Sequence, residues 1–190
     1  MKIFNFYTQF VIAFFFSNNI IAQAPYLKIS TGLSHLRSEY KGRYDYGLVY
    51  GLSLGLRSQH KMINYGGDIG FRTTRGNIKE INKNLSITMF QLSAGPEINI
   101  QNKFTFRAAF ILAYIATRSY RIQSPQYNFD FDAFDYSYTM SIYKNIFRLK
   151  NYSFDLEFYY LRSFDGITDN NFWQNDNLKI SNVGIGVIVH

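Results

Sequence analysis

The sequence predicts an all-β protein: an eight-stranded antiparallel up-and-down transmembrane β-barrel preceded by a cleaved signal peptide. Three observations lead to this prediction. Apolar residues alternate with polar or small residues in eight segments, which is the period of a strand with two unlike faces. Short and long connections alternate between these segments, as they do in a barrel that crosses a membrane. Within the segments, the charged residues share the face opposite to the apolar one.

Residues 1–22 are predicted to be a secretory signal peptide. Lys2 supplies the positively charged start, and residues 10–16 form the apolar core that such peptides require. An uncleaved membrane anchor is the alternative. We disfavour it because Asn18 and Asn19 interrupt the apolar run before it is long enough to cross a bilayer.

Cleavage is expected within the small-residue stretch 20–24, and we place it after Ala22. Cleavage after Ala24 also fits the usual pattern, but it would leave Pro25 as the first mature residue, which signal peptidases disfavour. Residues 23–190 are therefore expected to form one outer-membrane β-barrel domain, since their number suffices for one small barrel.

The most regular strands are predicted in residues 88–100 and 104–116, joined by a turn at residues 101–103. Counting outward from the turn, one face of this hairpin is apolar throughout. On the other face, Glu97 lies directly opposite Arg107, which makes an opposite-charge cross-strand pair. We therefore expect a long hairpin with one face against lipid and the other in the lumen.

The same alternation predicts six further strands, at residues 27–34, 47–57, 64–72, 136–143, 152–160 and 182–189. Short turns are expected near residues 59–60, 101–103 and 148–150, with longer loops elsewhere. Lys179 breaks the alternation before the last strand, so we expect a bulge or the start of the strand near it. The even number of strands places both ends of the mature chain on the periplasmic side.

The charged residues indicate which face meets lipid. The set expected in the lumen is Lys28, Arg57, Asp68, Arg72, Glu97, Arg107, Asp155 and Glu157. A lysine or arginine on the lipid face would cost about 2–4 kcal/mol at the middle of the bilayer, so their sorting favours lipid on the apolar face. A soluble lipocalin-like barrel, with its apolar face inside, is the alternative. The signal peptide and the 19% aromatic content favour the membrane barrel.

The predicted lumen set contains four basic and four acidic residues. We interpret it as a charge-paired plug that fills a narrow barrel. A path for protons or ions through the same residues is the alternative. Basic residues of the outer loops, such as Arg37, Arg75 and Arg118, are placed to meet lipopolysaccharide phosphates. Ordinary solvated loops are the alternative there.

Composition argues against several classes of site. Cysteine is absent, which excludes disulfides, thiol catalysis, cysteine metal sites and a lipobox anchor. The net charge is +7, but no basic run accompanies a nucleic-acid-binding fingerprint, so no nucleic-acid partner is expected. Residues 130–135 space their aspartates like a calcium loop yet lack its glycine and terminal glutamate. The three histidines are dispersed, so we expect neither metal nor cofactor.

The C-terminal strand carries the most specific pattern. Asn182, Gly184, Val187 and Val189 follow the spacing of the signal that the barrel-assembly machinery reads, with valines where aromatics are usual and with His190 beyond the end. With the signal peptide and the eight strands, this chain resembles the small outer-membrane β-barrel family. That family includes OmpX-like proteins, the OmpA transmembrane domain and the porin-family or PorT-like barrel domains.

The resemblance implies a non-enzymatic, monomeric integral protein of the bacterial outer membrane, in contact with its lipid and lipopolysaccharide, that serves envelope structure or surface binding. An accessory component of a secretion or envelope-assembly machine, with an envelope protein partner, is an alternative that the PorT-like resemblance allows. A lipid A-modifying enzyme is a further alternative. For that reaction His35, beside Ser34 and Ser38, is the candidate general base.

Overall fold

The computed structural model describes residues 23–37, 46–58, 63–78, 83–100, 103–119, 134–164, 167–169 and 176–190. The strands are β1 (Gln23–Arg37), β2 (Tyr46–Ser58), β3 (Ile63–Ile78), β4 (Lys83–Ile100), β5 (Phe104–Ser119), β6 (Phe134–Leu149), β7 (Tyr152–Ser163), β8 (Ile167–Asp169) and β9 (Asp176–Val189). In this part of the chain no helix is long and apolar enough to cross a bilayer. The predicted signal peptide lies outside the described residues and stays a prediction.

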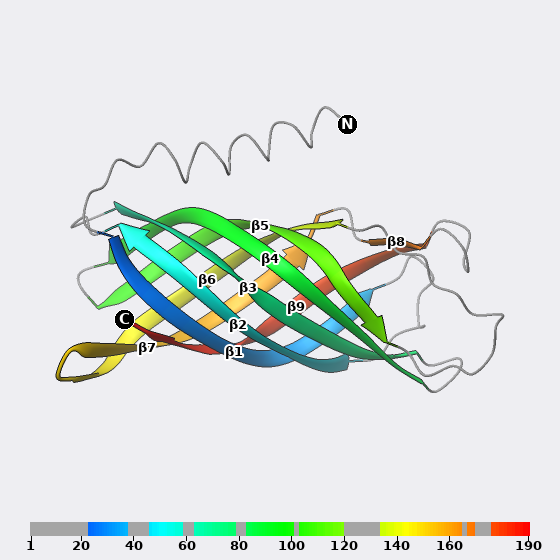
Figure 1. Cartoon of the computed structure of the whole chain (residues 1–190), viewed down its shortest axis with the longest axis horizontal. Helices are drawn as coiled ribbons and strands as arrows, with labels where there is room; N and C mark the ends of the chain where they lie inside the picture. The colour runs from blue at the N-terminus through cyan, green and yellow to red at the C-terminus, as the bar shows by residue number, and fades with distance from the viewer. Residues whose placement is uncertain are drawn as a thin grey trace, which may run out of the picture.

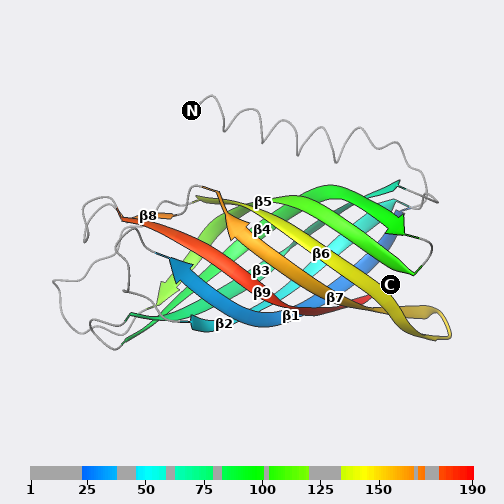
Figure 2. The ribbon, with the colours of Figure 1, turned by 180° about the vertical axis from the view of Figure 1, so that it is seen from behind.

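Eight strands close into an antiparallel barrel, which confirms the predicted fold class. Consecutive strands from β1 to β7 pair with one another, and β9 pairs with both β7 and β1. Figures 1 and 2 show β9 between these two strands, with the chain end at the same end of the barrel as the start of β1. The three-residue β8 was not predicted and pairs only with the start of β9.

β4 and β5 form the predicted central hairpin. Glu97 lies opposite Arg107, and Phe90 lies opposite Tyr114, so the register predicted from the turn is confirmed. The register shifts at residues 88–89, near the far end of the hairpin. Up to that bulge, the alternation of the sequence sorts every side chain of the pair onto one of two faces.

Every barrel strand extends beyond its predicted bounds at one end or both, and two of these ends are informative. β3 and β4 pair from Ile98 out to Lys83, across most of the segment 74–86 that was expected to be a loop. Backbone pairing continues there because it does not require apolar side chains on one face once the strands leave the hydrocarbon layer. Near Lys179 a bulge or the start of the strand was expected, and the structure has the start of the strand without a bulge. β9 begins at Asp176 and pairs with β1 in constant register, with Lys179 opposite Arg37.

Glycines on the inward side of the strands make room for large lumen side chains. Gly55 lies against the ring of Tyr26, and a Cβ added at Gly66 would stand 2.5 Å from Glu97 Oε1. A side chain at either position would therefore displace a lumen residue. The narrow interior of an eight-stranded barrel explains why small and large residues are paired in this way.

Candidate functional site

The outer wall of the barrel is a continuous apolar surface. Large apolar side chains point outward from every barrel strand, including Leu54, which is 61% exposed, and Phe158, which is 56% exposed. Others are Ile29, Leu33, Leu48, Leu52, Ile69, Phe71, Ile98, Phe106, Phe110, Met140, Ile142, Val183 and Ile185. No charged residue stands among these outward positions between the two rims of the described strands. This surface far exceeds the apolar patches of soluble monomers and matches the lipid-facing band of a membrane barrel.

The carboxylates lie on the other side of the wall. All five acidic side chains that the structure describes point into the lumen and are at most 4% exposed: Asp68, Glu97, Asp135, Asp155 and Glu157. A soluble lipocalin-like barrel would place charge outside and apolar side chains inside. The arrangement is the reverse of that alternative.

Glu97 occupies the centre of the lumen network. Its Oε2 atom lies 2.6 Å from Arg57 Nε, without the alignment of a hydrogen bond, and accepts a hydrogen bond of 2.6 Å from the Tyr143 hydroxyl. Its Oε1 atom lies 3.6 Å from Arg107 Nε. One fully buried carboxylate therefore balances two guanidinium groups that come from β2 and β5.

A second group of contacts surrounds Arg107. Its Nη1 donates to Asp68 Oδ2 at 2.9 Å, and Tyr26 donates to the same oxygen at 3.1 Å. Nearby, Lys28 Nζ lies 3.0 and 2.9 Å from the two carboxylate oxygens of Glu157. Because both partners of each pair are largely buried, removing one would leave a charge without compensation.

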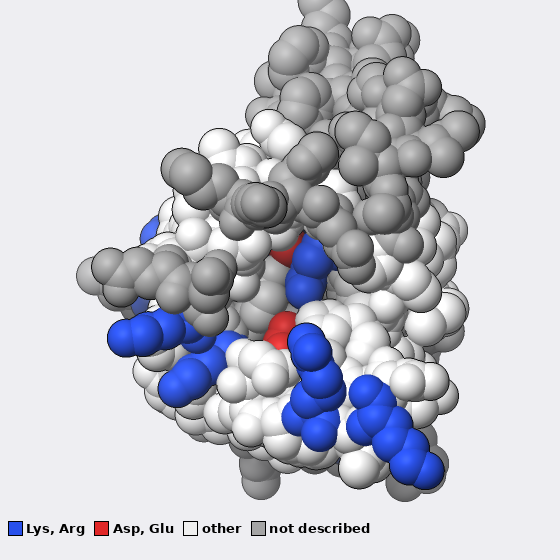
Figure 3. Space-filling view, turned by 90° about the vertical axis from the view of Figure 1, so that its left-hand side faces the viewer, with Lys and Arg blue, Asp and Glu red and all other residues white. Residues whose placement is uncertain are grey.

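The lumen ends in a polar mouth where the short turns and the C-terminus lie. Asp155 faces Arg57 at 3.8 Å and His190 Nε2 at 3.4 Å, and it accepts a hydrogen bond of 3.0 Å from Asn145. The backbone of His190 bonds to Ser153 in both directions and extends the β7–β9 ladder. Figure 3 looks into this mouth and shows Lys and Arg side chains around an opening with carboxylates deeper inside.

A third charged pair lies toward the opposite end. Arg72 Nη2 is 3.8 Å from Asp135 Oδ2, and Ser137 donates to Asp135 at 2.7 Å. Nε and Nη1 of Arg72 have no hydrogen-bond partner among the described residues. A cavity of about 30 Å³ separates Arg72 from Lys28 and Arg107. That volume and its polar lining suit one or two water molecules.

Around this pair the lumen is largely aliphatic, since Arg72 lies opposite Met89 and Asp135 lies opposite Ala113. A buried cluster fills it with Leu36, Leu85, Ile87, Met89, Ile111, Ala113, Ile115, Tyr159, Leu161 and Ile180. We call this cluster the apolar cap. The described lumen thus changes along its length from several ion pairs near the short turns to mainly aliphatic packing near the long connections, where the Arg72–Asp135 pair and buried polar side chains such as Asn182 also lie.

Comparisons with known proteins agree with this architecture. The structure of neisserial surface protein A matches with a TM-score of 0.51 at 10% identity, over 88% of this chain and 98% of that one. The chain has the fold of a small outer-membrane β-barrel. With its apolar wall, this fold agrees with the predicted place in the bacterial outer membrane.

Two more distant structures also cover most of the barrel. Ail of Yersinia pestis has a TM-score of 0.43 at 13% identity, over 89% of this chain and 99% of that one. OprG of Pseudomonas aeruginosa has a TM-score of 0.41 at 7% identity, over 88% and 97%. Comparison with protein-family models and with curated protein sequences found no match.

Sequence reasoning missed several lumen residues of the barrel. Asp135 precedes the predicted start of its strand at residue 136, although extending the alternation by one residue would have placed it inside. His190 was read as an extension beyond the last strand, yet its ring turns into the mouth. Tyr26, Tyr143 and Tyr159 were not included in the expected network, although the alternation places them on its face. With Asp135 and His190, the lumen contains more titratable groups than the predicted set of eight.

The outer rim of the barrel carries cations on its outward side. The described members are Arg37, Arg75, Arg162 and Lys179. Arg37 and Lys179 are directly opposite one another on β1 and β9. Arg162 lies on β7, the other neighbour of β9, opposite Ser181. Arg75 donates to the Tyr50 hydroxyl at 3.0 Å. Like charges on facing positions repel, so this arrangement favours an external anion.

His35 and Ser34 do not form a catalytic pair. Ser34 is fully buried on the lumen side, whereas His35 points outward and stacks on Tyr46 with ring centroids 4.5 Å apart. His35 Nδ1 accepts a hydrogen bond of 3.3 Å from Arg37. Neighbouring strand residues face opposite sides, so the two side chains cannot meet. Ser38 lies outside the described residues.

The predicted insertion signal lies along β9. Asn182 and Gly184 face the lumen, with Asn182 only 1% exposed, whereas Val187 and Val189 face lipid opposite Ile29 and Leu27. The strand therefore presents its two valines to the bilayer at the end near the short turns. Recognition of these residues by the assembly machinery stays a prediction.

Proposed function

We propose that this protein is a non-enzymatic outer-membrane barrel with a closed lumen, which serves envelope structure and binds surface anions at its outer rim. The filled lumen is the observation that carries the proposal. Most ion pairs lie in the half near the short turns, and the apolar cap, with the Arg72–Asp135 pair beside it, fills the half near the long connections. An ion entering from the mouth would lose its hydration at the cap, which is costly in a low-dielectric environment.

Conductance measurements in planar bilayers test the closed lumen. The intact barrel is expected to give no steady open-channel current. Replacing Ile87 and Leu161 of the apolar cap together by glycine is expected to raise conductance, because both are at most 4% exposed and face the lumen. Steady currents through the unaltered barrel would refute the proposal.

Surface binding is proposed for the cations of the outer rim. Lipopolysaccharide phosphates are the expected ligands, since they are the dense anions at that depth of the outer leaflet and suit charge-assisted hydrogen bonds. Changing Arg37 and Lys179 together to glutamine should weaken binding to lipopolysaccharide about tenfold or more, at roughly 1 kcal/mol per cation. Changing Lys103 and Lys144 at the other rim is the matched control, and an equal loss there would refute a specific outer-rim site.

A further inference from the structure

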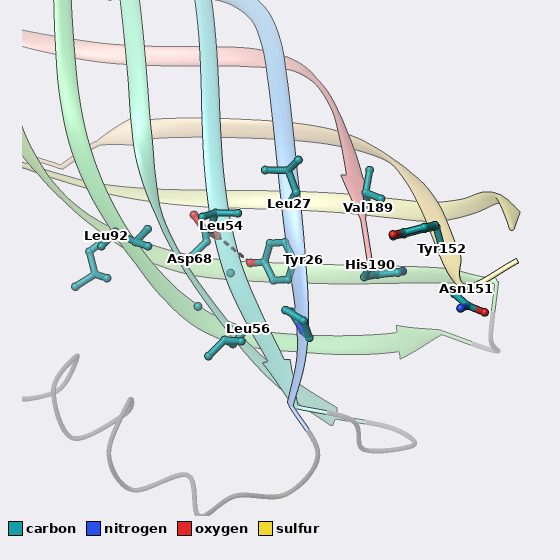
Figure 4. A pocket seen from close by; sticks show the side chains of 14 residues that line it. Tyr26, Leu27, Leu54, Leu56, Asp68, Leu92, Asn151, Tyr152, Val189 and His190 are labelled. Atoms are coloured by element: carbon teal, nitrogen blue, oxygen red, sulfur yellow. Dashed lines mark hydrogen bonds between the residues drawn. The ribbon is translucent and has the colours of Figure 1, made fainter. Parts of the chain in front are cut away.

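A groove crosses the lipid-facing wall of the barrel and ends at the periplasmic mouth. Its volume is about 780 Å³, and its lining is almost wholly apolar. Figure 4 shows that it runs from Leu92 past Leu54 and Leu27 to Val189, with Tyr152 and Asn151 at its end. The groove is deepest at Gly67, which has no side chain to fill it and lies between Leu56 and Ala94. Gly67 is the one described glycine on the outward side of the wall.

The groove follows one row of cross-strand neighbours. This row joins Leu92, Ile69, Leu54, Leu27 and Val189, which line the groove, to Phe154, which continues the row on β7, the strand whose Tyr152 lines the end of the groove. Five strand spacings of about 4.8 Å give it a length of about 24 Å. With strands tilted by about 40°, the row rises about 15 Å along the membrane normal, which is the depth of one hydrocarbon leaflet. The groove therefore spans the inner leaflet from the bilayer middle to the periplasmic surface.

The end of the groove opens into a polar pocket of about 610 Å³ at the barrel mouth. Asn151, Tyr152 and His190 line both spaces, and the polar pocket adds Arg148 and Lys150. These two cations are exposed and form no ion pair within the described residues. The described anion nearby is Asp155, which faces Arg57 and His190.

We propose that the groove and the mouth pocket together bind one anionic glycerophospholipid of the inner leaflet. An acyl chain lies in the groove, and the phosphate is held by Arg148 and Lys150, with Asn151 and Tyr152 at the junction. Three features select this occupant. The groove is continuous with the lipid-facing wall, its rise matches one leaflet, and its polar end carries two cations without described partners. The site is independent of the outer rim to which surface binding is assigned.

Quenching by brominated lipids tests the proposal on the whole refolded barrel. Phe154→Trp, in a chain whose single tryptophan Trp173 is changed to Phe, places a reporter in the row. The probes are phosphatidylcholine vesicles in which either phosphatidylglycerol or phosphatidylcholine carries the bromine. Brominated phosphatidylglycerol is expected to bind about fivefold more strongly beside the reporter, as a single well-placed cation can provide. Equal quenching by the two lipids would overturn the proposal.

Matched variants separate the site from general attraction to the membrane. The double variant Arg148→Gln with Lys150→Gln should bring the preference for phosphatidylglycerol over phosphatidylcholine close to a ratio of one. The double variant Lys103→Gln with Lys144→Gln removes the same charge at the same rim and should leave that ratio unchanged. An equal loss in both pairs would reduce the effect to surface potential and overturn the proposal.

A second pair of variants tests the groove. Gly67→Phe fills its floor and should lower the preference at least about twofold, whereas Ala108→Phe adds the same bulk to the wall elsewhere and should not. Heat-modifiable migration on a gel verifies that each variant is folded. No effect of Gly67→Phe in a folded barrel would remove the acyl-chain part of the site.

Discussion

Replacing Glu97 by glutamine is expected to destabilise the barrel by about 3 kcal/mol. Breaking a buried ion pair costs about 3–5 kcal/mol when one partner stays charged. The lower end applies here because Arg107 keeps Asp68 at 2.9 Å and Arg57 keeps Asp155 at 3.8 Å. Glutamine also preserves an acceptor for the Tyr143 hydroxyl. The cost therefore reports the charge of Glu97 rather than its volume.

Urea titration of the barrel refolded in phospholipid vesicles measures this cost, with the folded fraction read from gel migration without heating. Lys103→Gln, at an exposed turn, is the control and should change the free energy of unfolding by less than about 0.5 kcal/mol. In an Arg57→Met background, Glu97→Gln should cost at least about 1 kcal/mol less, because the two side chains are in contact. A loss below about 1 kcal/mol in the single variant, or no coupling between the two, would refute the reasoning.

Three further predictions concern the wall, the lumen and the last strand. Leu52→Arg, at the middle of β2, should lower the free energy of unfolding by about 2–4 kcal/mol, whereas Tyr46→Arg at the rim should lower it by at most about 1 kcal/mol. Urea titration compares the two variants, and equal costs would contradict the lipid-facing assignment. Gly66→Val should displace the Glu97 carboxylate and reduce the folded yield on a heat-modifiability gel, and an unchanged yield would count against tight lumen packing. Deleting residues 184–190 should abolish outer-membrane assembly in cell fractionation, and normal insertion would refute the insertion signal.

The central hairpin shows what local pattern decides. Its register follows from the turn at residues 101–103, because pairing outward from a short turn leaves one arrangement that keeps all apolar residues on one face. The opposition of Glu97 and Arg107 could be read in the same way. The strand ends were less predictable, as at Lys179, because a strand above the hydrocarbon layer needs no alternation.

The lumen contacts required the closed barrel. Glu97 was expected to meet Arg107, its cross-strand neighbour, yet its shorter contact is to Arg57 on β2. A strand intervenes between β2 and β4 in the sheet, so only curvature of the wall brings these side chains together. The turn of His190 into the mouth likewise depends on the position of β9 between β7 and β1.

By itself the sequence determined the number of barrel strands, the sorting of residues onto two faces and the membrane location. These follow from a period of two and from the cost of each charge in lipid, which act on every residue independently of distant ones. Only the tertiary structure decided which charges pair, where the apolar cap begins and how the groove crosses the wall. These features depend on the stagger of six or more strands around the closed barrel, which brings together residues that no local pattern relates.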